Sequence, residues 1–181
     1  MFAVRKIVTI VPKKIYSIQF EGESSDSFHL LFDRWNDISW LYMFFNDQRH
    51  HELLKNYFYT SSIDAIKYTI ELAGEMEKRI YNAAKGIGNE KLSDLFKPLS
   101  KKERTPYPRM KIYGPDYARW LRVYGIKIDE DLYIITGGGI KLTKKMQQSP
   151  FLEEQLERLK VVKEYLKSNG ITSFDDIEWI L

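Results

Sequence analysis

Apolar and polar residues alternate in two segments at the beginning of the chain, residues 2–11 and 14–20. In the second segment Tyr16, Ile18 and Phe20 recur at every other position, which is the repeat of a β-strand with one buried face. A proline lies between the two segments, and it would interrupt a continuous strand. The pattern therefore predicts two strands joined by a short turn.

Apolar residues at three- and four-residue spacing predict several helices. The clearest begins at Ser61 or Ser62 and ends at Gly86, with an acid in its first turn and basic residues in its last turn. Shorter patterns of the same kind predict helices after Asp26 or Ser27, after Asp37, after Ser149, and after Thr172 or Ser173. The last of these carries apolar residues up to the C-terminus, which either pack on the core or form a surface for a partner.

The chain is organised around a predicted β-hairpin. Residues 121–128 and 132–136 are rich in β-branched and aromatic side chains, and three acids at positions 129–131 separate them. This arrangement predicts two antiparallel strands with a three-residue loop, at the centre of a sheet.

Trp120, Arg122 and Tyr124 are expected to share one face of the first hairpin strand, because side chains alternate along a strand. Gly125 either continues the strand or marks a β-bulge, which would change this alternation. The second strand leads into three consecutive glycines, residues 137–139, whose free amides could nest an anion. We favour the alternative, a permissive segment where the backbone turns sharply, and the spacing excludes a P-loop.

Residues 100–118 are predicted to form a long loop, because they contain three prolines and a glycine. The segment also carries five lysines or arginines and the tyrosines Tyr107, Tyr113 and Tyr117. Basic residues interleaved with aromatic residues suit RNA, whose bases stack on rings while its phosphates meet cations. A basic surface loop whose tyrosines pack on the core is an equally good interpretation.

Composition adds an uneven distribution of charge. The 181 residues carry a net charge of +3, but residues 97–145 contain twelve basic and five acidic residues, so this segment carries +7 and the rest −4. A basic block on an otherwise acidic chain indicates either a surface for a polyanion or a solvated face with scattered lysines. The chain lacks cysteine and any run of transmembrane length, so we expect a cytoplasmic protein without a membrane partner.

We expect no metal and no cofactor. His50 and His51 are adjacent on a predicted helix, so their side chains point in different directions, and no third residue is spaced to complete a zinc site.

A family resemblance joins these features. Amphipathic helices are followed by the segment Leu95–Leu99. An arginine-bearing strand comes next, within the sequence LRVYGIKIDEDLYIITGGGIKLTKKMQ at residues 121–147. This order resembles the RelE/ParE/HigB superfamily of type II toxin–antitoxin toxins, in the variants whose sheet ends in Gly-Gly-Gly-Ile-Lys. The resemblance covers residues 13–165 of a single domain spanning residues 1–181, with residues 1–12 as an N-terminal extension and 166–181 as a C-terminal tail. The chain departs from compact toxins in its extra N-terminal strand, its long helical region and its long basic loop.

The resemblance implies an α+β fold, with a small twisted, mainly antiparallel sheet and helices packed on one face. It implies the toxin of a toxin–antitoxin system, acting as a metal-independent mRNA endoribonuclease at the ribosome. The implied partners are mRNA, the ribosome and a cognate antitoxin of helix-turn-helix type. The ParE branch implies a gyrase-directed inhibitor instead. A non-enzymatic module that binds RNA through the basic face, or a protein through the apolar C-terminus, is a further alternative.

In RelE-type cleavage the ribose 2′-hydroxyl attacks the adjacent phosphate, so the protein must orient the chain, help move protons and neutralise the developing charge. The resemblance implies catalytic roles for Arg122, Tyr124 and Lys141, with Arg119 as the alternative strand arginine. The implied nucleic-acid-binding residues are Arg109, Lys111, Arg119, Lys144 and Lys145. Surface ion pairs with nearby acids are the competing interpretation for Arg122 and Lys141.

Overall fold

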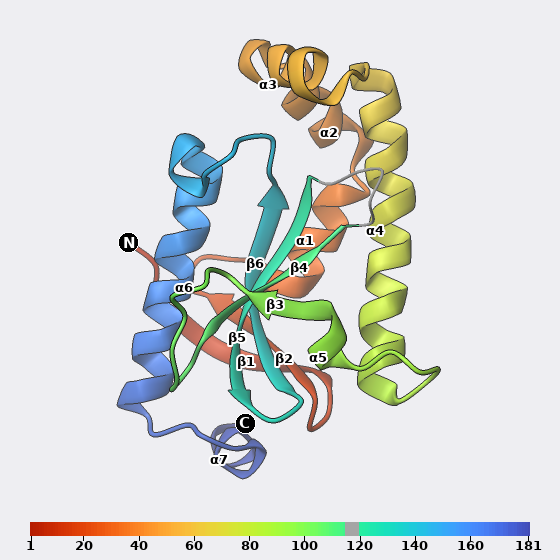
Figure 1. The fold of residues 1–181 in the computed structure, drawn as a ribbon. Helices are drawn as coiled ribbons and strands as arrows, with labels where there is room; N and C mark the ends of the chain where they lie inside the picture. The colour runs from red at the N-terminus through yellow and green to blue at the C-terminus, as the bar shows by residue number, and fades with distance from the viewer. Residues whose placement is uncertain (115–119) are drawn as a thin grey trace.

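The computed structural model describes residues 1–114 and 120–181 as a mixed sheet flanked by helices (Figure 1). Six strands make up the described sheet in the order β1-β2-β6-β5-β4-β3. Their bounds are Val4–Val11 (β1), Ile15–Phe20 (β2), Phe96–Pro98 (β3), Arg109–Tyr113 (β4), Leu121–Asp129 (β5) and Leu132–Ile140 (β6). β2 and β6 pair in parallel and the other neighbours are antiparallel, which confirms the predicted α+β class and the mainly antiparallel sheet.

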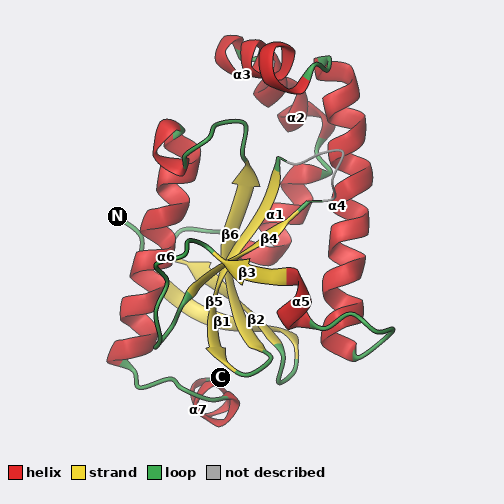
Figure 2. Cartoon of the chain, in the orientation of Figure 1, coloured by secondary structure: helices red, strands yellow, loops and turns green. Residues whose placement is uncertain are grey.

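The helices include one in each region where the sequence predicts a helix, together with several short ones (Figure 2). They are α1 (Ser27–Trp35), α2 (Ile38–Asn46), α3 (Gln48–Leu53), the π-helix η1 (Leu54–Phe58), α4 (Ser62–Lys85), α5 (Leu92–Leu95), the short 3-10 helix η2 (Met146–Gln148), α6 (Pro150–Ser168) and α7 (Phe174–Ile180). The predicted caps are confirmed for four of them, because the side chains of Asp26, Asp37, Ser61 and Ser173 accept hydrogen bonds from the first-turn amides of α1, α2, α4 and α7. Gly86 ends α4 with a φ of 72°.

Helices cover both faces of the sheet, so the expectation that they pack on one face is wrong. α1 and α4 lie on one side and α6 lies on the other (Figure 1). The reason is visible in β6, where Ile134 packs in the α6-side core and the adjacent Ile135 packs in the α1-side core. Consecutive apolar residues in a strand point to opposite faces, so each face needs its own cover.

The central hairpin is confirmed, with a shorter loop than expected. Asp129 pairs with Leu132, so two residues rather than three lie between β5 and β6. One of them, Asp131, has a φ of 55°, a conformation that aspartate tolerates in turns.

The predicted long loop at residues 100–118 is interrupted by a strand. β4 pairs with β5 on one side and with β3 on the other, which corrects the loop assignment. Pro106 and Pro108 precede β4 and so do not disturb its ladder, and Pro115 lies outside the described residues. Tyr107 is 5% exposed, and its hydroxyl donates to the carbonyl of Ile171 at 2.7 Å, so this tyrosine belongs to the core and does not stack on a ligand.

Residues 38–61, from α2 to the first cap of α4, form a helical arm that stands beyond one end of the sheet (Figure 1). At the opposite end lies α7. Its Ile177 is buried, whereas Trp179 is 89% exposed, so the apolar C-terminal residues divide between core and surface. No helix in the described ranges is long and apolar enough to cross a membrane.

Candidate anion-binding site

A pocket of about 460 Å³ opens on the α6 side of the sheet. We call it the basic pocket, because six cationic side chains line it: Arg109, Lys111, Arg122, Lys141, Lys144 and Lys145. Tyr113 and Tyr124 also line it, and no acidic side chain of the described ranges does. The structure therefore brings together every predicted site residue that it describes, while Arg119 lies outside the described residues.

Strand register accounts for the first half of this pocket. Tyr113 pairs with Arg122 and Lys111 pairs with Tyr124 across the β4–β5 ladder. Directly opposed side chains in a sheet lie on the same face, so these four residues form one continuous patch. The predicted alternation of β5 is confirmed for Arg122 and Tyr124.

Trp120 departs from that prediction. It precedes the first residue of β5, and its indole packs in the α1-side core instead of facing the pocket. The indole N–H donates to the Thr69 hydroxyl at 3.0 Å, which fixes the ring against α4.

A β-bulge places Lys141. Tyr124 pairs with Gly137 but its neighbour Gly125 pairs with Ile135, so Thr136 is an extra residue in β6. The expected bulge therefore lies on the strand opposite Gly125 and leaves the alternation of β5 intact. It inverts the alternation of β6 beyond Thr136, and Lys141 consequently joins the face of Arg122.

The three glycines are part of β6 and not an anion nest. A Cβ on Gly138 would come 2.5 Å from a methyl carbon of Leu31 in α1, and one on Gly137 would collide with the Gln155 carboxamide of α6. Both sheet faces thus approach the backbone closely at this point. The glycines are needed for this close packing within a strand, so the expectation of a sharp backbone turn is wrong.

Arg122 lies on the pocket floor in a cation–π contact. Its guanidinium carbon is 4.3 Å from the ring centroid of Tyr113, and Nη1 donates to the Leu121 carbonyl at 2.9 Å. Burial lowers the pKa of Arg122, while the neighbouring Tyr124 and Tyr113 act in the opposite direction. Arginine stays charged under such a shift, so the floor carries a positive charge that is only partly solvated.

The Tyr124 hydroxyl is a buried polar group without a hydrogen-bond partner in the described part of the chain. The residue is 1% exposed, and burial raises its pKa well above 10 despite the nearby Arg122 charge. A protonated phenol that lines an anion pocket is a hydrogen-bond donor and not a base.

The pKa of Lys141 depends on its burial and on the neighbouring cations. Burial lowers its pKa, and the charges of Arg122 and Lys111 lower it further. Its ammonium donates to the Lys144 carbonyl at 2.7 Å, which ties it to the connection between β6 and α6. An anion entering the pocket would relieve this mutual repulsion.

Arg109 is already paired with an acidic side chain, Glu103. Its guanidinium forms a fork with Glu103, including Nη2 to Oε1 at 2.7 Å, and the Glu103 side chain is 5% exposed. Burial alone would raise the pKa of Glu103, but the hydrogen bonds and charge of Arg109 outweigh it and hold that pKa below its usual value. Arg109 therefore stiffens the pocket wall, and its charge is largely neutralised.

Tyr113 is the site residue whose role the sequence did not indicate. Besides Arg122, it carries the Lys111 ammonium 5.0 Å from its ring centroid, so one ring orients two pocket cations. The alternation in Arg109–Tyr113 is the signal that would have placed Tyr113 on a strand beside Arg122.

The fold and site define an α+β protein with a basic pocket on one face of a mixed sheet. Comparisons with family models, with curated proteins and with solved structures found no match.

Proposed function

We propose that this chain is a toxin of the RelE/ParE/HigB type, a metal-independent mRNA endoribonuclease that acts at the ribosome. The observation that supports it most is the convergence of Arg122, Lys141 and Lys111 with the Tyr124 hydroxyl in one pocket without lining carboxylates among the described residues. A phosphodiester carries its charge on oxygens that accept hydrogen bonds, so it fits this set of donors.

The proposed reaction forms a bond between the ribose O2′ and phosphorus and breaks the bond from phosphorus to O5′. Negative charge grows on the non-bridging oxygens, where the Arg122 guanidinium and the Lys141 ammonium would stabilise it. The Tyr124 hydroxyl would donate a hydrogen bond to the same oxygens or to the departing O5′, because its raised pKa keeps it protonated. The O2′ proton would pass to water or to the ribosome, and the departing O5′ would take up a proton from the same sources and leave as a 5′-hydroxyl, since no histidine lines the pocket.

The test is cleavage of end-labelled mRNA with and without ribosomes. Wild-type protein should give products with 2′,3′-cyclic phosphate ends, and Arg122→Met and Tyr124→Phe should each lose at least about a hundredfold in rate, as for removal of one transition-state donor. Lys78→Met, which removes one charge from the exposed face of α4, should cleave normally. A wild-type protein inactive under both conditions would contradict the endoribonuclease assignment.

A non-enzymatic RNA-binding module is the second candidate, and the six pocket cations favour it independently of any reaction. It predicts salt-dependent RNA binding without cleavage, with a shallower logarithmic salt dependence for each pocket cation removed. DNA damage on expression without mRNA loss would instead support a gyrase-directed inhibitor.

The proposal includes an antitoxin partner. A small helix-turn-helix protein encoded beside this chain should co-purify with it and relieve growth arrest on co-expression. Growth arrest that such a neighbour does not relieve would argue against the toxin assignment.

A further inference from the structure

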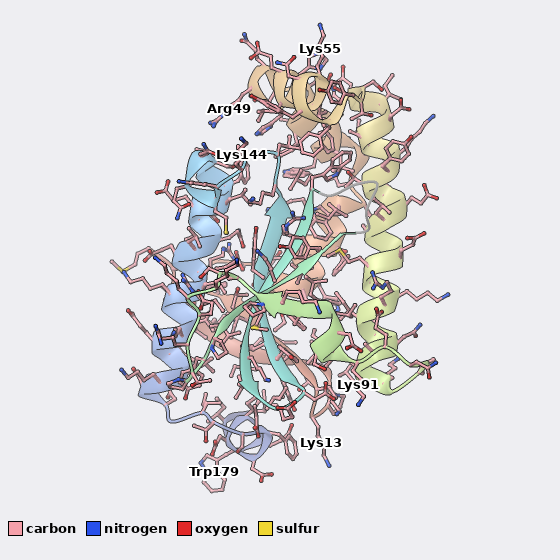
Figure 3. The ribbon with its side chains drawn as sticks, in the orientation of Figure 1. Lys13, Arg49, Lys55, Lys91, Lys144 and Trp179 are labelled. Atoms are coloured by element: carbon pink, nitrogen blue, oxygen red, sulfur yellow. The ribbon has the colours of Figure 1, made fainter. Side chains whose placement is uncertain are left out.

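A second cavity, of about 620 Å³, lies between the helical arm and the exit of β6. We call it the arm cleft. Its walls include Leu53, Tyr57 and Phe58 from the arm and Leu142 from the β6 exit, with Arg49 and Lys144 as its cations. Figure 3 shows Arg49 and Lys144 at this end of the molecule, where the arm stands beyond the sheet.

The two aromatic residues of the arm cleft differ in their freedom. Phe58 is held in an edge-to-face contact with Trp120, with ring centroids 5.5 Å apart, and Trp120 is anchored on α4. Tyr57 is 67% exposed. One wall is thus fixed by the core, while the other offers an open aromatic ring.

The arm cleft adjoins the basic pocket. Lys144 lines both cavities, so the two cavities meet at this residue. Arg49 closes another side, because its guanidinium donates across the cleft to the Gln148 carbonyl of η2. No acidic side chain of the described ranges lines either cavity, so both suit an anionic ligand.

We propose that the arm cleft is a base-binding subsite for single-stranded RNA, holding an unpaired base beside Tyr57 while a backbone phosphate of the same strand occupies the basic pocket. The inference rests on the part of the proposed function that makes RNA the ligand, and it does not depend on cleavage. An aromatic ring beside a phosphate-binding patch is the usual arrangement for binding single strands, where the ring stacks on a base and the cations track the backbone. The continuity through Lys144 and the paired cations favour a nucleic acid over an apolar peptide.

The experiment compares two non-cleavable 2′-O-methyl oligonucleotides, one with bases and one abasic throughout, in binding titrations with the full chain. Tyr57→Ala should weaken binding of the base-containing strand about tenfold, the size expected for one lost stacking contact. It should leave binding of the abasic strand and of inorganic pyrophosphate unchanged. Tyr57→Trp should restore the affinity, because it restores an aromatic face.

Tyr42→Ala is the matched control, since Tyr42 is 61% exposed on the same arm and does not line the arm cleft. It should bind both strands as the wild type does. If Tyr57→Ala binds the base-containing strand normally while Arg122→Met does not, the subsite is overturned and the RNA-binding pocket stands. Equal weakening of both strands by Tyr57→Ala also overturns it. A wild-type protein that binds neither strand overturns the proposed function itself, and an acidic peptide that competes with neither strand supports the assignment to RNA.

Discussion

The two faces of the sheet use the same strands for opposite purposes. On the α1 side, Leu121, Val123 and Ile135 are buried in a continuous core. On the α6 side, Ile126 of β5 and Ile134 of β6 are equally buried toward one end of the sheet, and Arg122 and Tyr124 at the other end of β5 line the basic pocket. One strand, β5, therefore closes the α1-side core with Leu121 and Val123 and lines a cationic site on its other face with Arg122 and Tyr124.

Side chains from both faces approach the glycine segment of β6 closely. The α1 side approaches Gly138 through Leu31, and the backbone carbonyl of Arg122 lies beside it. A change at this position therefore disturbs the packed face and the pocket floor together.

Gly138→Ala is expected to produce the largest loss of stability, about 3 kcal/mol, because the new methyl group would overlap Leu31 and a backbone oxygen that cannot rotate away. Urea-induced unfolding followed by circular dichroism measures this free energy. Gly74→Ala is the control, since a Cβ there meets nothing within 4 Å and the residue lies inside α4. It should stabilise the protein by roughly 0.5–1 kcal/mol. Similar effects of the two substitutions would show that close packing is not the reason for glycine in β6.

Local signals predicted most of this architecture. The caps of α1, α2 and α4 and the strands of the hairpin depend on interactions between residues that are close in the sequence, so local patterns were enough to predict them. β4 was missed because prolines and cations surround Arg109–Tyr113 and outweighed its alternation. The cover of the second face by α6 was missed because the fold implied by the resemblance places helices on one side.

The main residues of the candidate site could also be predicted from the sequence, but some of their contacts could not. Arg122, Tyr124 and Lys141 came from the resemblance and from strand alternation, and the structure places them in one pocket. The fork between Arg109 and Glu103 and the contact of Tyr113 with Arg122 depend on how distant or unrecognised elements pair, so periodicity alone does not reveal them.

The fork between Glu103 and Arg109 gives a test of the pocket wall. Glu103→Gln should lower the free energy of unfolding at pH 7 by about 2 kcal/mol, because it leaves a partly buried guanidinium without its counter-charge. Its RNA affinity should rise, since the Arg109 charge is no longer neutralised. Thermal or urea unfolding and a binding titration measure the two effects, and Glu130→Gln, at an 85% exposed side chain, should change neither.

The pH dependence of the same pair has a defined sign. The pKa of Glu103 is lower in the folded protein than its ordinary 4.5, so its contribution is complete above pH 4.5 and disappears as the pH falls through the lowered value. The stability difference between wild type and Glu103→Gln should therefore shrink in acid. A difference that stays constant from pH 7 to below this window would rule out the charged fork as its source.

The smallest expected effect is a pH dependence caused by Lys141, which should change RNA affinity and stability in opposite directions. Burial, Arg122 and Lys111 lower the pKa of Lys141 below 10.5, so Lys141 loses its proton at a lower pH than an ordinary lysine does. Affinity for an alkali-stable 2′-O-methyl oligonucleotide should fall by about tenfold as the pH rises through that lowered pKa, because one cationic phosphate contact is lost. Stability should change in the opposite direction: between the lowered pKa and 10.5 the unfolded chain binds more protons at this residue, so its contribution to the free energy of unfolding rises with pH.

Lys141→Arg keeps its charge across this range, so subtracting its titration and unfolding curves from those of the wild type isolates the residue. If affinity falls while stability rises, the charged form of Lys141 contributes to RNA binding and destabilises the folded protein. Curves that differ between the two proteins in neither property would remove Lys141 from the site and leave Arg122 and Lys111 as its central cations.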